Sequence, residues 1–418
     1  MKPRILIALL GVMLAACGRR DAPAPASATQ APTPTTRSPA AASASASSLE
    51  TVESVNARLR RQLRSGKADT TVIAQLFAIE VAPLPGVTPP AGRVEDKFEG
   101  TDAALRLESV WLELTPEQRT VAAPYLGLAP FPDAKRQLPP FNMKPFAPPA
   151  AATRALRSNP AFGPRLVEAG FLLVPGPPQT TEDKYRTYFQ GIYKWANQAI
   201  AGLTGASALS DTFELDFFND PADAWVITSD FEFLCADPTV DWLTTPVANC
   251  RVADGNGGRK AGDTIDLQRR RRNCHSFINL AKFNGQDEGT IVSVITHEVF
   301  HCYQQHAVGS AAEVNQVASW LGEGQPTWVQ AKLVSGAVYP ALTQHWVTYV
   351  STPKGRLFDR SYDALGFFGH LGDVTGDSDV ATHLISGFQA GVGNSGSAYH
   401  HLTGANEDAV VDRWGSSY

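Results

Sequence analysis

The sequence has no marked excess of either charge. It carries 36 Lys and Arg against 41 Asp and Glu, which gives a formal net charge of -5 and a pI near 6.0. Such a balance provides no general attraction to nucleic acid or to an anionic membrane surface, and we expect no nucleic-acid partner. Internal repeats and a regular strand–helix alternation are also missing. Their absence favours an α+β fold.

A long apolar run at the N-terminus is missing as well. The run found there, Ile5–Leu14, is shorter than the roughly 20 residues that a membrane-spanning helix requires. Lys2 and Arg4 precede it, and small residues follow it up to Cys17, which is the order of regions in a secretory signal. We therefore expect residues 1–16 to be removed on export.

The end of this signal, Leu14-Ala15-Ala16-Cys17, resembles the lipobox of bacterial lipoproteins. The resemblance implies that Cys17 becomes the lipid-modified N-terminus, which anchors the protein in a membrane of the cell envelope. Gly18, rather than Asp, follows the cysteine. This resembles the sorting signal for the outer membrane, with the protein facing the periplasm or the cell surface. A plain signal peptide with an incidental cysteine is the alternative.

Large apolar side chains are almost absent from Asp21–Ser48, which consists mainly of Ala, Pro, Ser and Thr. A segment of this composition cannot bury enough surface to offset the entropy that it would lose on ordering. Residues 17–48 are therefore predicted to be a lipid anchor followed by a disordered tether. Such a tether would hold the folded part away from the membrane.

Cysteine is scarce, and no two of the five cysteines have CxxC spacing. The lack of this spacing argues against a metal site built from cysteines. Four cysteines remain beyond Cys17, and an even number in an exported protein favours disulfides over free thiols. Four cysteines allow three connectivities. We expect one pair to be Cys235 with Cys250 and the other to be Cys274 with Cys302.

The first third of the folded part, residues 49–180, is expected to be a mainly helical region. A helical periodicity runs over Leu49–Ile79, with prolines after it. Thr115 can cap a second helix over Pro116–Leu126. The Pro- and Phe-rich stretch Phe131–Pro149 predicts irregular chain.

Residues 181–418 are expected to form a second domain that combines strands and helices. Apolar and aromatic residues recur at helical spacing over Thr181–Leu203, which predicts a structural helix. A strong helix is expected to begin near Gly289. Three strands are predicted from apolar, aromatic and β-branched runs, at Phe213–Phe218, Ala224–Phe233 and Ser276–Leu280.

The helix that begins near Gly289 contains the sequence His297-Glu298-Val-Phe-His301. Its two histidines are four residues apart and therefore project from one face, at the spacing that two imidazoles need to share one zinc ion. Glu298 lies one residue further round the helix, where its carboxylate can act on a metal-activated water as a general base. Two histidines on a solvated face are the alternative. One side of the helix is predicted to be buried, because apolar residues recur every four positions at Ile291, Ile295 and Val299.

A catalytic zinc needs a third protein ligand and an open fourth position. His306 does not fit the longer three-histidine motif, which requires a histidine at position 307 and a glycine at position 304. Glu313 is available but lies in a run without distinguishing features. Glu323 stands between two glycines and shortly before Pro326, which suits the first turn of a helix. Glu323 is therefore the expected third ligand.

The histidine motif and the downstream Trp-Leu-Xaa-Glu-Gly-Xaa-Pro segment together resemble the gluzincins, which include the thermolysin-like and aminopeptidase N-like zinc metallopeptidases. The resemblance covers roughly Ser276–Leu371. It implies a zincin-like core with a mixed sheet, an active-site helix and a following helical subdomain. It also implies that His297, His301 and Glu323 bind one zinc ion and that Glu298 is the general base.

One position departs from the thermolysin-like pattern. Four residues after the ligand Glu323, those enzymes have an Asp that orients a ligand histidine, whereas this sequence has Thr327. Because such partners set ligand orientation, metal affinity or geometry can differ here. The resemblance further suggests Tyr362 for stabilisation of the oxyanion, with His370 and His345 as alternatives. Tyr362 is equally compatible with a structural role in the core.

These motifs favour a zinc-dependent peptidase that acts on peptide or protein substrates at the cell envelope. The lack of an aminopeptidase GxMEN motif favours an endopeptidase. The alternative is a lipid-anchored binding module with a gluzincin-like fold, whose zinc is non-catalytic or absent. Glu298 argues against it, because a purely structural zinc site has no use for a general base. A third alternative, an accidental motif on a lipid-tethered scaffold, predicts no bound metal.

Overall fold

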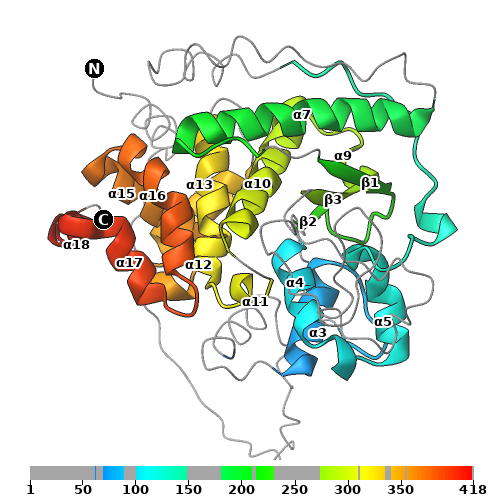
Figure 1. Ribbon diagram of the computed structural model, residues 1–418, viewed down its shortest axis with the longest axis horizontal. Helices are drawn as coiled ribbons and strands as arrows, with labels where there is room; N and C mark the ends of the chain where they lie inside the picture. The colour runs from blue at the N-terminus through cyan, green and yellow to red at the C-terminus, as the bar shows by residue number, and fades with distance from the viewer. Residues whose placement is uncertain are drawn as a thin grey trace, which may run out of the picture. The chain divides into compact units, whose positions relative to one another are not determined.

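The computed structural model describes residue 62 and residues 69–88, 100–147, 180–209, 213–229, 274–308, 311–334, 340–353 and 355–416. The chain divides into two compact units, Met1–Ser48 and Leu49–Tyr418, and every described residue belongs to the second. This part is mostly helical and contains a small three-stranded sheet, so the fold class is α+β (Figure 1). The expected signal, lipid anchor and tether lie outside the described residues.

The described part of the N-terminal region, up to residue 147, contains the helices α3 (Thr70–Glu80), α4 (Thr101–Ser109) and α5 (Pro116–Ala122), with 3-10 turns at Trp111–Glu113, Ala123–Leu126 and Asp133–Lys135. α3 is the described end of the helix predicted over Leu49–Ile79, and the Asp69 side chain caps it. Thr115 caps α5 as predicted, in a capping box with Gln118. From residue 136 to residue 147 the chain is irregular, in agreement with the prediction.

The remaining helices are α7 (Thr181–Thr204), α9 (Leu280–Phe283), α10 (Glu288–Ala307), α11 (Ala311–Val314), α12 (Ser319–Gly322), α13 (Gly324–Leu333), α14 (Pro340–Ser351), α15 (Leu365–Thr375), α16 (Asp377–Ala390), α17 (Ser395–Thr403) and α18 (Glu407–Ser416). Three further 3-10 turns lie at Leu357–Asp359, Tyr362–Ala364 and Gly404–Asn406. α7 agrees with the helix predicted over Thr181–Leu203. It lies along the top of Figure 1 and packs across α10 and α13.

The sheet consists of β1 (Glu214–Phe218), β2 (Val226–Ser229) and β3 (His275–Asn279), in the order β1-β3-β2. All three overlap the predicted strands. β3 runs parallel to β1, with Ser276 opposite Leu215, and antiparallel to β2, with Ser276 opposite Thr228. Within the described sheet, β2 is therefore an edge strand.

Two hydrophobic cores lie on opposite sides of the sheet. One contains α3, α4 and α5 together with Ile227 and Phe277 of the sheet. The other contains α7, α10 and the C-terminal helices together with Leu215 and Ile278. Successive strand residues point to opposite faces, which explains why neighbours on β3 enter different cores. The N-terminal helices thus share a core with the sheet, and the boundary expected at residue 180 does not separate two cores.

α10 is surrounded on all sides. The sequence predicted one buried side, but every residue from Thr290 to Gln305 is buried. The prediction was too narrow because α10 packs against α7, α13, α16 and β2 at once. Asp287 caps the helix by accepting a hydrogen bond from the Thr290 N–H, at 3.0 Å. Polar side chains in the middle of such a helix are removed from water and need partners inside the protein.

Cys274, just before β3, forms a disulfide with Cys302 on α10, and their Cα atoms are 5.7 Å apart. This is one of the two pairs expected from the sequence. The bond fixes α10 to the central strand one residue after His301. The other expected pair, Cys235 and Cys250, lies outside the described residues.

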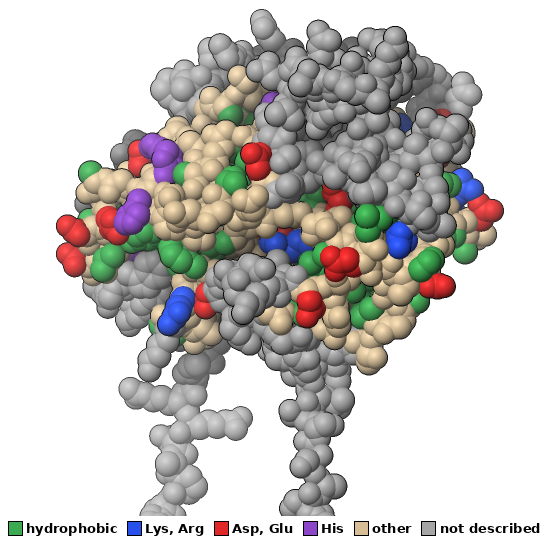
Figure 2. Space-filling model, turned by 60° about the horizontal axis from the view of Figure 1, so that its bottom comes forward, with side chains coloured by type: hydrophobic (Ala, Val, Ile, Leu, Met, Phe, Trp, Pro, Cys, Tyr) green, Lys and Arg blue, Asp and Glu red, His purple; other side chains and the backbone are tan. Residues whose placement is uncertain are grey.

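The described surface carries charges of both signs. On the face shown in Figure 2, acidic and basic side chains of the described residues are interspersed, without a large patch of one sign. This agrees with the near balance of charge in the sequence. None of the described helices is long and apolar enough to cross a membrane.

Candidate metal centre

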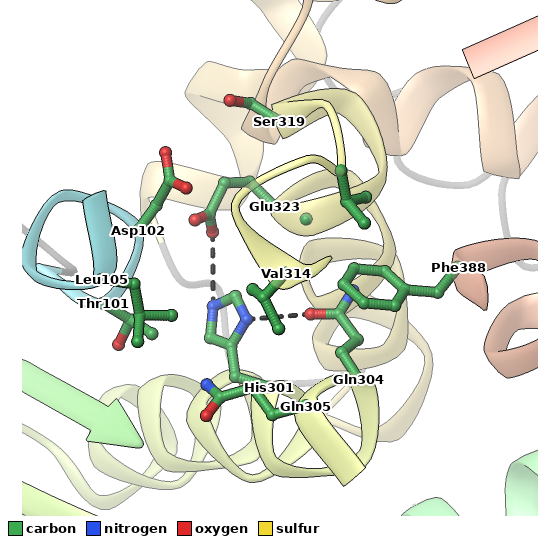
Figure 3. Close-up of a pocket in the computed structure, with 12 residues that line it drawn as sticks. Thr101, Asp102, Leu105, His301, Gln304, Gln305, Val314, Ser319, Glu323 and Phe388 are labelled. Atoms are coloured by element: carbon green, nitrogen blue, oxygen red, sulfur yellow. Dashed lines mark hydrogen bonds and ion pairs between the residues drawn. The ribbon is translucent and has the colours of Figure 1, made fainter. Parts of the chain in front are cut away.

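Three side chains that can bind a metal meet between α10 and the α12–α13 junction. Nε2 of His297 lies 3.2 Å, and Nε2 of His301 3.4 Å, from Oε2 of Glu323. Figure 3 shows His301 and Glu323 facing each other. The three residues are 0%, 5% and 3% exposed, and their donor atoms all lie within 4.8 Å of one another. This buried group can hold one metal ion.

The backbone around Glu323 is held in place by close packing. A Cβ on Gly324 would lie only 2.7 Å from the Cβ of Ala364. The backbone at this position comes so close to its neighbour that only glycine fits. A Cβ on Gly322 would meet no atom within 4 Å, so the same requirement does not apply there. Thr327 donates its hydroxyl hydrogen bond to the Glu323 carbonyl, at 2.6 Å. Thr327 therefore supports the backbone of the carboxylate rather than a histidine ring.

Glu323 carries a negative charge in the folded protein. Burial alone would raise the pKa of its carboxyl, but the adjacent His301 and His297 outweigh this and hold that pKa well below its usual range. A buried carboxylate that faces two imidazole nitrogens is a suitable place for a cation. Two imidazoles and one carboxylate also match the three protein ligands of known catalytic zinc sites. The residues present therefore fit a zinc ion.

Each ligand histidine has a glutamine partner on its second ring nitrogen. Nδ1 of His297 lies 3.3 Å from Oε1 of Gln330 on α13, and Nδ1 of His301 lies 2.9 Å from Oε1 of Gln304 on α10. Both glutamines are buried. The sequence has Thr327 where thermolysin-like enzymes have an Asp that orients a histidine. The two glutamines contact the histidine rings instead, and their amides carry no charge.

The expected general base, Glu298, is fully buried beside this group. Its Oε2 accepts a hydrogen bond from the hydroxyl of Thr101 on α4, at 3.2 Å. That hydroxyl in turn accepts one from the backbone N–H of Thr228 on β2, at 2.8 Å. A residue of the N-terminal region thus links the general base to the edge strand.

Two further aromatic side chains, those of Tyr362 and His345, lie near His297. The ring centroid of Tyr362 is 6.0 Å from that of His297 and 5.1 Å from that of His345, on which it stacks. Burial lowers the pKa of His345 to about 4, against the opposing effect of Asp363, so its ring is neutral at pH 7. His370 instead contacts the Val410 carbonyl through Nε2, at 3.0 Å. Tyr362 and His345 are therefore the candidates that the structure places beside the site.

A pocket opens next to His301 and Glu323. Its lining includes Thr101, Asp102 and Leu105 of α4 (Figure 3). These residues could not be predicted from the sequence, because nothing local relates α4 to a helix almost two hundred residues later. The Gln304 partner could have been found, since it lies one helical turn after His301.

The rejected ligand candidates stay outside the group. Among the described residues, neither His306 nor Glu313 belongs to a cluster of three or more side chains that could hold a metal. Comparisons of the chain with protein-family models, with curated proteins and with solved structures gave no match. Function is therefore inferred from the residues of the site.

Proposed function

We propose that this protein is a zinc-dependent peptidase that hydrolyses peptide bonds at the cell envelope, with His297, His301 and Glu323 as metal ligands. One observation carries the proposal: the motif residues, 22 and 26 positions apart from Glu323 in the chain, meet as a buried two-imidazole, one-carboxylate group. The sheet, the helix α10 and the following helices also fit the zincin-like arrangement that the gluzincin resemblance implies. No comparison contributes to this step.

The chain supplies the groups that peptide hydrolysis requires. A zinc ion held by the three ligands would activate a water molecule and polarise the substrate carbonyl. Glu298, next to a ligand on the same helix, would take the proton of the attacking water and pass it to the leaving amine. Tyr362 would donate a hydrogen bond to the oxygen that becomes negative in the transition state.

A binding module with non-catalytic zinc is the second candidate. The burial of Glu298 and its hydrogen bond to Thr101 favour it, because an active base must reach both water and substrate. The two candidates differ in a measurable way. Both bind zinc, but only the peptidase has turnover that depends on the Glu298 carboxylate.

The deciding experiment uses the protein without residues 1–48 and its Glu298→Gln variant. Zinc content and casein cleavage are measured for both. We expect one zinc per chain in both proteins and cleavage only in the wild type. Zinc without cleavage in either protein would favour the binding module, and a protein without zinc would refute the site itself.

A further inference from the structure

We propose that Gln330 and Gln304 are the positioning residues of the metal site, each fixing the ring orientation of one histidine ligand through a neutral amide. The inference rests on the proposed zinc site. It concerns what determines the zinc affinity of that site. In such centres a carboxylate commonly contacts the second nitrogen of a ligand histidine, and here a glutamine amide takes its place.

The Gln330 amide lies between Ser293 and His297. Its Nε2 donates to Oγ of Ser293 at 2.7 Å, and its Oε1 faces Nδ1 of His297 at 3.3 Å. An amide oxygen can only accept, so Nδ1 of His297 carries the hydrogen. Nε2 of the same ring then presents its lone pair toward Glu323, as a metal ligand must.

The Gln304 amide is fixed by two acceptors, one of which is a backbone carbonyl that cannot donate. Its Nε2 donates to the Leu321 carbonyl at 3.0 Å and to Oε1 of Gln325 at 3.1 Å. Its Oε1 is thus left for Nδ1 of His301, at 2.9 Å. Gln325 is itself anchored by the Leu384 carbonyl, at 2.9 Å. The side chains of Gln304 and Gln325 are at most 1% exposed, so their hydrogen bonds are largely shielded from solvent.

The test measures zinc affinity by chelator competition and ligand geometry by the absorption spectrum of the cobalt-substituted protein. Gln330→Met and Gln304→Met remove the acceptor and should weaken zinc binding by about 10- to 100-fold, with a changed cobalt spectrum. Gln305→Met is the matched control. Gln305 is the neighbouring buried amide on α10, and it donates to the Thr228 carbonyl at 3.2 Å.

Gln330→Glu keeps the shape and adds a charge. Ser293 can donate to the new carboxylate, so this variant should fold and bind zinc at least as tightly as the wild type. Affinities of the two methionine variants equal to that of Gln305→Met would overturn the inference while leaving the zinc site intact. A wild type that binds no zinc would instead overturn the proposed function.

A different observation carries a second inference: we infer that Gly100 and α4 form an internal cover, which must move before a peptide can reach Glu298. The cover occupies the free edge of β2. The Ala224 N–H donates to the Val81 carbonyl at 2.9 Å, and the Gly100 N–H donates to the Val226 carbonyl at 3.2 Å. The Thr228 N–H donates to the Thr101 hydroxyl at 2.8 Å.

The Ala224 N–H, the Val226 carbonyl and the Thr228 N–H belong to alternate residues and point away from β3. An extended peptide that paired with β2 would use these same three groups. Gly100 is packed so tightly there that a Cβ would lie 2.7 Å from the Val81 side chain. The bond from Thr101 to Glu298 then places the cover on the general base itself. With His301 only 5% exposed and Glu298 not exposed, the described arrangement admits no peptide.

Polar contacts of Arg106 and Asn315 hold α4 to the segment that follows α10. Arg106 is buried, pairs with Asp102 at 2.9 Å and donates to the Asn315 carbonyl at 3.2 Å. The Asn315 amide donates back to the Leu105 carbonyl at 3.0 Å. Single substitutions can remove these polar contacts one at a time, so the cover can be loosened without changing the metal ligands.

Arg106→Ala and Thr101→Val test the cover in zinc-loaded protein. Both should raise the rate of zinc release to a chelator and the kcat/KM for a short fluorogenic peptide, each by about 5-fold or more. Arg119→Ala is the matched control, because Arg119 also donates to a carbonyl of the N-terminal region, that of Leu114 at 3.0 Å.

Rates in both test variants equal to those of Arg119→Ala would overturn the cover. Reduced cleavage with unchanged zinc release would also overturn it, because α4 would then be required by the open site. Adding Glu298→Gln to Arg106→Ala separates the two proposals. Cleavage that survives this addition would refute the proposed mechanism, whatever the behaviour of α4.

Discussion

At the residue scale, Tyr362 is the side chain whose role can be tested most directly. Its ring stacks on His345 and lies 6.0 Å from the ring of His297. If its hydroxyl stabilises the oxyanion, Tyr362→Phe should lower kcat by about 100-fold, with little change in zinc content or KM. Steady-state kinetics on a peptide substrate give this value.

The control for Tyr362 is His370→Gln. His370 contacts the Val410 carbonyl, so its loss should change kcat by no more than about 2-fold. Equal losses in the two variants would contradict the assignment of Tyr362. They would indicate that both changes act through the packing of α15.

His345 makes the stability of the protein depend on pH. Its pKa is lowered by burial from 6.5 to about 4 in the folded state. Between these values the unfolded chain binds a proton that the folded chain does not, so stability is complete above pH 6.5 and falls as the pH is lowered toward 4. We expect a loss of about 1–3 kcal/mol from this residue.

Urea unfolding of zinc-free protein at pH 7.5 and pH 4.5 measures this dependence, with metal release excluded. His345→Gln has no such proton to bind and should lose correspondingly less stability between the two values. An identical loss in wild type and variant would show that the His345 ring stays accessible to protons in the folded state.

The three side chains that could hold a metal ion were predicted from the sequence, because their spacing encodes their geometry. His297 and His301 lie one helical turn apart, and Glu323 stands in a recognisable segment. Gln330 and Thr101 could not be predicted, since their contacts with His297 and Glu298 depend on how separate helices pack. Local periodicity carries no information of that kind.

At the element scale, the disulfide between Cys274 and Cys302 joins the central strand to the helix that carries both histidines. It closes a loop with a sequence separation of 28. The entropy of such a loop predicts that replacing both cysteines by Ala lowers the free energy of unfolding by about 3–4 kcal/mol.

Urea unfolding with and without dithiothreitol measures this contribution. Reductant should destabilise the wild type by about this amount more than it destabilises the double variant, in which only the expected Cys235–Cys250 pair remains to be reduced. A wild type that is insensitive to reductant, even after unfolding in its presence, would contradict the pairing.

The presence of helices was predicted better than their burial and their neighbours. The helix over Thr181–Leu203 and the capping box at Thr115 follow from periodicity and local hydrogen bonding, and both are found. The complete burial of α10 was not foreseen, because its apolar pattern indicates one buried side and its other sides are buried with paired polar groups. The position of α4 beside α10 is likewise a tertiary property.

At the scale of the whole molecule, the lipid anchor at Cys17 stays a prediction. The full-length protein should fractionate with membranes of the expressing bacterium, and mass spectrometry of its N-terminal peptide should show an acylated Cys17. Cys17→Ala removes the residue that would be acylated, so this variant should lose the acylated N-terminal peptide and shift from the membrane fraction toward the soluble fraction. A membrane-bound Cys17→Ala protein would contradict the lipid assignment.

The α+β class could be predicted, but the sharing of a core between the N-terminal helices and the sheet could not. The sequence suggests one region up to residue 180 and another beyond it, whereas the described helices α3 to α5 share a core with the sheet. Composition shifts mark linkers, and they do not reveal which face of a distant strand a helix covers.

The two cores on opposite sides of the sheet also impose an order of events on biosynthesis. The N-terminal core contains Val72 and Phe77, yet it is closed by Phe277 of β3. Until the ribosome has made β3, this core lacks Phe277, and the contacts that close it are of high sequence separation. The N-terminal core is therefore completed only shortly before the residues of the possible metal group are made, and both form late in synthesis.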